Sequence, residues 1–150
     1  MKMPPLEKIP EAYSAIADQR VVLSPGRAEI KPSDGRKTYL VEWDGDRYSA
    51  NDNGSYWQGY AGYPVIAVLM LQGRLPYDLE DALHFRGLNW KALNTAHKNN
   101  YAAALKEVMG RLKELGIDVE RLNQNMNRTY QALAKLNLTI KRGRLKPGSA

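Results

Sequence analysis

Four basic residues follow one another at a spacing of seven along the last segment that we expect to be helical. They are Arg121, Arg128, Lys135 and Arg142. Because an α-helix turns by roughly 100° per residue, residues seven apart stay on one side of it. A row of groups with one sign of charge is suited to contact the phosphates of a polyanion.

The other residues on this face are mostly uncharged: the amides Gln124, Asn125 and Gln131, and Thr139. Glu120 is the only acidic residue between the expected helix cap Asp118 and the end of the helix. A solvated surface face is the ordinary alternative, although such faces usually mix the two signs of charge. Cations and amides together contact phosphate and sugar oxygens. We therefore predict that nucleic acid or another polyanion binds this face, with Arg144 adding a contact.

A second row of basic residues lies in the preceding segment, at spacings of seven, eight and seven: Lys91, Lys98, Lys106 and Lys113. Glu107 and Glu114 lie beside this row. Lysines in such positions often cover apolar surface with their stems. The second row is therefore weaker evidence for a polyanion than the first.

The segment 48–63 is rich in aromatic residues and glycine. Tyr56 and Trp57 are predicted to stack on nucleic-acid bases. The alternative is a small-molecule or anion site, for which the candidate residues are Asn51, Asp52, Asn53, Ser55 and Tyr60. Glycines before a helix start would let backbone N–H groups approach an anion. A third interpretation is that these aromatic residues only pack on neighbouring helices. The segment contains no phosphate-binding glycine motif.

Candidate catalytic residues are scarce. The chain has no cysteine, and its two histidines, His84 and His97, lie on separate expected helices. Neither the histidines nor the serines stand in a recognised catalytic or zinc-binding spacing. We therefore predict no catalytic residue, no metal and no cofactor, and we favour a binding protein over an enzyme. Carboxylates that converge only in the folded chain would escape this reasoning.

The positive charge is concentrated in the C-terminal part of the chain. Residues 98–150 carry 11 basic against 4 acidic residues, and residues 1–97 carry 11 against 12, for a net charge of +6. This asymmetry favours an anionic partner. The longest apolar run, Val65–Leu71, is too short to cross a bilayer, and the N-terminus lacks the apolar run of a signal peptide. We expect a soluble, cytoplasmic protein with no membrane partner.

The pattern of residues predicts an α+β fold. A short N-terminal helix should begin near Pro10. Short β-prone runs between about 20 and 60 should form a small antiparallel β-meander. Asp44-Gly45 has the chemistry of a hairpin turn. A second turn at Asn53-Gly54 would return the chain through a strand at Ser55–Trp57.

The part from about 64 to 140 should be helical. Val65–Leu71 is apolar on all sides, which fits a buried helix or a buried central strand. A long helix capped by Asn89, a turn at Leu115–Asp118 and a last helix should form a C-terminal antiparallel helical hairpin. We expect one α+β domain over 1–140 and a flexible basic tail over 141–150.

The expected helical hairpin also suggests a different class of function. It would pair with a partner protein or with a second copy as a homo-oligomer. The residues expected to anchor such an interface are Trp90, Leu93, Tyr130 and Leu133.

Overall fold

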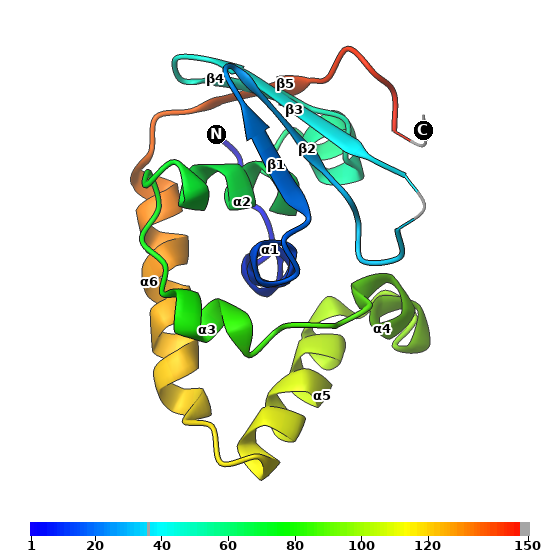
Figure 1. Ribbon diagram of the computed structural model, residues 1–150, viewed down its shortest axis with the longest axis vertical. Helices are drawn as coiled ribbons and strands as arrows, with labels where there is room; N and C mark the ends of the chain where they lie inside the picture. The colour runs from blue at the N-terminus through cyan, green and yellow to red at the C-terminus, as the bar shows by residue number, and fades with distance from the viewer. Residues whose placement is uncertain (36, 148–150) are drawn as a thin grey trace.

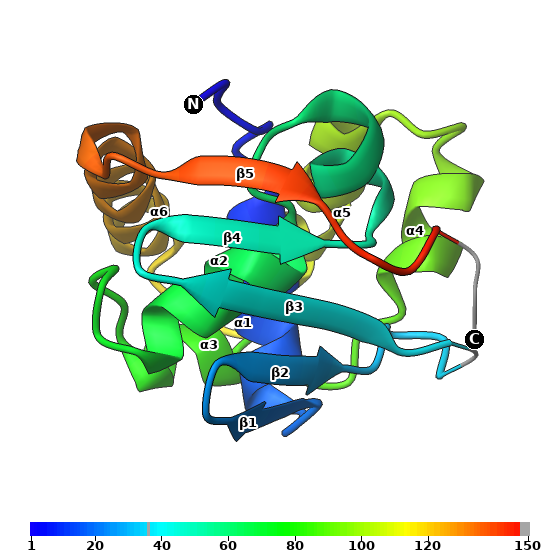
Figure 2. The same cartoon turned by 90° about the horizontal axis from the view of Figure 1, so that it is seen from above.

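A five-stranded sheet lies on one side of the molecule, and helices cover one of its faces (Figure 1). The computed structural model describes residues 1–35 and 37–147. The strands are β1 (Val21–Ser24), β2 (Arg27–Ile30), β3 (Tyr39–Asp44), β4 (Arg47–Ala50) and β5 (Thr139–Arg142). The first four pair antiparallel in chain order, and β5 pairs parallel to β4 (Figure 2). The fold is therefore α+β, as the sequence predicts.

The described residues also form α-helices. They are α1 (Lys8–Ala17), α2 (Tyr63–Leu71), α3 (Leu79–Leu83), α4 (Trp90–Ala96), α5 (Tyr101–Glu114) and α6 (Val119–Lys135). One turn of π-helix, η1 (Gly54–Gln58), lies between β4 and α2.

Glycines make the two tight hairpins of the sheet possible. Gly26 and Gly45 have φ values of 73° and 59°, a region that side chains with a Cβ rarely adopt. The hairpin predicted at Asp44-Gly45 therefore forms between β3 and β4. Its register places Val41 opposite Ala50, and both are buried on the face that the helices cover.

The centre of the core is α2. Every residue from Pro64 to Met70 is buried, and α1 packs against this helix. Val65–Leu71 is therefore helical, which decides between the two structures that the sequence allowed. The helix α1 is itself buried from Ile9 to Ile16, so its polar residues lie inside the protein.

The long helix expected from Asn89 is wrong, because two helices replace it. Lys98 and Asn99 adopt positive φ values of 54° and 63°, which end the run of helical backbone after α4. The Asn100 side chain then accepts a hydrogen bond from Ala103 N–H and caps α5. Asparagine side chains compete for backbone groups in this way, and apolar periodicity does not reveal it. The lysines of the second row consequently do not share one helix.

The strand expected at Ser55–Trp57 is also wrong. The Asp52 carboxylate accepts a hydrogen bond from Ser55 N–H, and the backbone turns into η1. Gly54 lies in this turn without a positive φ, so the Asn53-Gly54 pair does not make the expected hairpin.

The C-terminal part differs from the expected flexible tail. The helix α6 ends at Lys135, and Thr139–Arg142 forms β5, so Lys141 and Arg142 belong to the sheet. Leu138 is buried and Ile140 lies opposite Tyr48, which gives this short strand its apolar attachment. Residues 148–150 of the expected tail lie outside the described residues.

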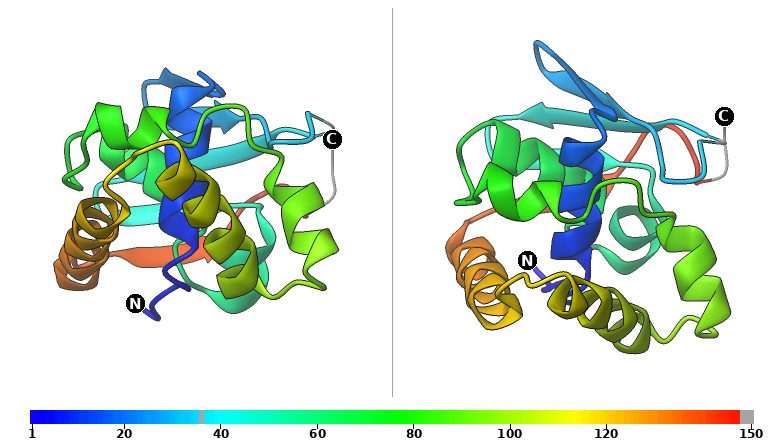
Figure 3. Two further views of the ribbon diagram at one scale, coloured as in Figure 1. Left: turned by 90° about the horizontal axis from the view of Figure 1, so that it is seen from below. Right: turned by 60° about the horizontal axis from the view of Figure 1, so that its bottom comes forward.

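The helices α5 and α6 meet at the turn that joins them and diverge from it in the views of Figures 1 and 3. The four expected interface anchors lie mainly against the protein's own core. Trp90 and Leu133 are buried in the core, and Leu93 and Tyr130 are half-buried where they pack against it. The interface that these residues were expected to form is therefore not exposed.

Candidate ligand-binding site

A cavity of about 450 Å³ lies where α1, the segment before β3, η1 and α4 approach one another. We call it the central pocket. Six aromatic side chains line it: Tyr39, Trp57, Tyr60, Tyr63, Trp90 and Tyr101. Charged side chains from α1 and from the end of β4 complete its wall. Its volume lies in the range of about 300–1,000 Å³ that is usual for small-molecule sites.

Asp52 is the most unusual group in this wall. Its side chain follows β4, and the residue is only 5% exposed. Oδ2 accepts a hydrogen bond of 3.1 Å from Ser55 N–H, whereas buried Oδ1 has no hydrogen-bond partner within residues 1–35 and 37–147. Burial raises the pKa of the carboxyl group, and the hydrogen bonds from Ser55 and the charge of Lys8 oppose this rise only in part. A buried polar atom without a partner is unfavourable and uncommon in native proteins.

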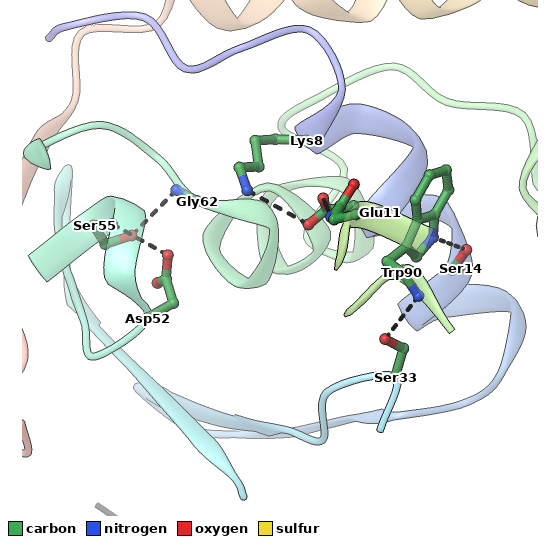
Figure 4. A network of polar contacts seen from close by, with 9 residues as sticks. Lys8, Glu11, Ser14, Ser33, Asp52, Ser55, Gly62 and Trp90 are labelled. Carbon is green, nitrogen blue, oxygen red and sulfur yellow. Dashed lines mark hydrogen bonds and ion pairs between the residues drawn. The ribbon is translucent and has the colours of Figure 1, made fainter. Parts of the chain in front are cut away.

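A glycine makes room for this carboxylate. A Cβ placed at Gly62 would overlap the Asp52 side chain. Gly62 N–H also donates a 3.1 Å hydrogen bond to Ser55 Oγ, so η1 and the start of α2 are tied together around Asp52 (Figure 4). The position of the carboxylate therefore depends on the close approach of these two segments.

Lys8 and Glu11 stand on the facing wall, one helical turn apart on α1. Lys8 Nζ lies 3.6 Å from Glu11 Oε2, and Asn94 Nδ2 donates to Glu11 Oε1 at 3.4 Å. Burial raises the pKa of Glu11, against the attraction of Lys8. For Lys8, burial acts to lower the pKa, but the surrounding Glu11, Tyr60, Tyr101 and Asp52 outweigh it and the pKa is raised. Figure 4 shows the Lys8 side chain between the Asp52 group and Glu11.

Another cation in the pocket wall, Arg20, has partners of its own. Arg20 Nε lies 3.6 Å from Asp18 Oδ2, and Arg20 Nη1 donates a hydrogen bond to the Lys31 carbonyl oxygen. Burial raises the pKa of Tyr63 strongly and that of Tyr39 to about 12, so both phenols stay neutral at physiological pH. The pocket therefore combines neutral aromatic walls with two buried carboxylates and one ammonium group between them.

One family model matches residues 1–139 and carries the description "Uncharacterised conserved protein UCP014422". The chain belongs to this family. No curated protein and no solved structure matches the chain. The matched range contains all residues that line the central pocket, from Lys8 to Tyr101, and it ends before Arg142 and Arg144.

The candidate ligand-binding residues divide into two groups. Asp52, Asn53 and Tyr60 line the central pocket. Asn51 and Ser55 are buried and bond to the backbone of neighbouring segments. Asn51 Oδ1 accepts a hydrogen bond from Leu40 N–H at 2.8 Å, and Ser55 Oγ accepts one from Gly62 N–H.

Sequence reasoning missed the residues that α1 and α4 contribute. Glu11 and Lys8 lie far from segment 48–63 in the chain, and Trp90 was expected to anchor a protein interface. The one available signal was an acidic residue in a short helix otherwise composed mainly of apolar and small residues.

The candidate nucleic-acid-binding residues do not form one surface. Arg142 Cζ lies 5.2 Å from the Tyr56 ring centroid and 5.5 Å from that of Trp57, so these three residues meet at the end of β5. Arg144 Nε instead pairs with Glu42 Oε1 at 2.8 Å. The helix α6 leads into the opposite end of β5 (Figure 2).

The N-terminal part of the basic row, on α6, faces acidic residues. Arg121 and Arg128 line a second cavity, of about 230 Å³, together with Asp78 and Asp81 at the start of α3. Lys135 lies in the last turn of α6. The row is therefore neither continuous with Arg142 nor free of negative neighbours. Among the described residues, no helix is long and apolar enough to cross a membrane.

Proposed function

We propose that the protein binds a small polar organic molecule in the central pocket. The observation that carries this proposal is the Asp52 carboxylate, which is buried in the wall of a ligand-sized cavity with Oδ1 unpaired. Burying a charged group without a full set of partners is costly, so such a group favours a ligand that supplies the missing donor.

The rest of the wall supports a ligand with both polar and flat apolar parts. Aromatic faces provide contact area, and the amides of Asn53 and Asn94 add groups that both donate and accept hydrogen bonds. A few placed polar groups among apolar walls are the usual composition of a small-molecule site.

Thermal unfolding in the presence of candidate ligands tests the proposal. The panel contains nucleosides, neutral sugars, amino sugars and aromatic amines at millimolar concentration. We expect at least one class to raise the Tm, because a ligand that binds only the folded state stabilises it by mass action. The shift should disappear in Asp52→Asn and persist in Asp44→Asn, a matched change at an exposed hairpin residue. A panel without any shift, or shifts equal in both variants, would contradict the proposal.

A second candidate function is binding of a single-stranded nucleic acid at the end of β5. The specific observation in its favour is the group formed by Tyr56, Trp57 and Arg142, in which a guanidinium lies over two aromatic rings. Trp57 is 59% exposed and so remains accessible to a base.

Fluorescence anisotropy of a labelled single-stranded oligonucleotide tests this candidate. Binding should weaken steeply as salt rises, and Arg142→Gln should weaken it more than Arg128→Gln on α6. No binding at low salt, or equal losses in the two variants, would count against it.

A further inference from the structure

Two buried carboxylates in the wall of the central pocket differ in their pairing among the described residues. Glu11 and Asp52 are both buried there, and the charge of Lys8 acts to lower the pKa of both carboxyl groups. Lys8 Nζ lies 3.6 Å from Glu11 Oε2, and no ion pair to Asp52 exists within residues 1–35 and 37–147. When both carboxyl groups are ionised, Asp52 is therefore the one without a paired cation among the described residues.

The other cations of the pocket have partners of their own. Arg20 pairs with Asp18, and Lys91 Nζ pairs with Asp34 Oδ2 at 3.2 Å. Lys37 Nζ lies over the Tyr39 ring, 5.9 Å from its centroid. None of them forms an ion pair with Asp52 among the described residues. An ionised Asp52 therefore lacks a cationic partner among the described residues, and a cationic ligand would supply one.

The walls of the pocket already accept ammonium groups. Lys8 Nζ lies 4.9 Å from the centroid of the Tyr101 ring, and Lys2 Nζ lies 5.9 Å from that of Tyr60. Tyrosine faces attract cations, and this attraction is strongest where water is excluded. An ammonium group close to Asp52 would meet the same kind of surface.

We infer that the ligand of the central pocket carries a primary ammonium group, which donates a hydrogen bond to Asp52 Oδ1. This inference rests on the proposed function, and it adds the chemical class of the ligand. Three N–H donors on one compact cation fit a site with an unpaired carboxylate oxygen on one side and aromatic faces on the others. A neutral molecule of the same shape would leave the charge of Asp52 uncompensated.

Matched pairs of amines and alcohols test the inference on the unmodified protein. The pairs are benzylamine with benzyl alcohol, and glucosamine with glucose, measured by isothermal titration calorimetry at pH 7.5. In at least one pair we expect the amine to bind about tenfold or more tightly than its neutral partner, as for other hydrogen bonds to charged groups. Asp52→Asn should abolish this preference, and Asp44→Asn should retain it.

The outcomes separate the inference from the proposed function. If a neutral member of a pair, or a neutral nucleoside, binds as tightly as any amine and competes at the same site, the inference fails and the proposed function stands. A divalent cation that displaces the amine through Asp52 would also overturn it. If neither these probes nor the wider panel binds, both fail. Since the amine–alcohol comparison uses the native chain, it remains decisive even if Asp52→Asn does not fold.

Discussion

The central pocket and the basic C-terminal part gather charge in opposite ways. The pocket brings Lys8 and Glu11 of α1 together with Asp52, which follows β4, in a largely buried space. The basic residues of α6 and β5 stay at the surface, and two of them face acidic residues of α3. A regular row of charges in sequence therefore does not show which charged groups the fold brings together.

The largest effect that we predict is a loss of stability caused by a substitution at the central pocket. Gly62→Ala places a Cβ against the Asp52 carboxylate, so we expect a loss of about 1–3 kcal/mol in the free energy of unfolding. Urea denaturation measures it. Gly110→Ala is the matched control, because its Cβ meets no atom within 4 Å in α5.

We expect Gly110→Ala to stabilise the protein by roughly 0.5–1 kcal/mol, since alanine has the higher helix propensity. Equal effects of the two substitutions would show that the space around Asp52 is not as tight as described.

A smaller effect is a change in how stability depends on pH. Burial raises the pKa of Asp52 above 3.8 in the folded state, so folding favours its protonated form. The stability that this proton contributes is present below pH 3.8 and is lost as the pH rises through the raised pKa. Asp52→Asn has no such loss, so its stability relative to the native chain should increase between pH 4 and pH 7.

Urea denaturation of both proteins at the two pH values measures this difference. Asp44→Asn should show no comparable trend, because Asp44 is exposed. A constant difference for Asp52→Asn would contradict the assignment of Asp52 as a buried, poorly paired carboxyl group.

The smallest effects should come from the basic row on α6. Arg121→Gln, Arg128→Gln and Lys135→Gln should each change the free energy of unfolding by no more than about 0.5 kcal/mol, as is usual for surface positions. Calorimetric titrations of any ligand of the central pocket should be unchanged by them. A large loss of ligand affinity in one of these variants would place the binding site near α6 instead.

The sequence predicts the elements better than their junctions. The α+β class, the Asp44-Gly45 hairpin and the apolar segment Val65–Leu71, which is buried as far as Met70, follow from local chemistry. The break at Lys98 and Asn99 and the π-helical turn after Asp52 depend on side chains that bond to nearby backbone. Apolar periodicity contains no information about such bonds.

The site was predictable only in part. Asp52, Asn53 and Tyr60 lie in one unusual segment, so composition pointed to them. Glu11 and Asn94 are joined by a hydrogen bond across 83 positions of the chain, and only the packing of α4 near α1 creates it. The row of basic residues does not lie on one helix, because α6 ends at Lys135 and Arg142 belongs to β5.

Chemical-shift mapping tests the central claim most directly. The protein labelled with ¹⁵N is titrated with benzylamine, glucosamine and adenosine in turn. We predict that at least one probe shifts the amide signals of Ser55 and Gly62, whose N–H groups donate to Asp52 Oδ2 and Ser55 Oγ. Signals of α6 should stay in place. Shifts confined to α6 and β5, or no shifts with any probe, would contradict the assignment of the central pocket as the binding site.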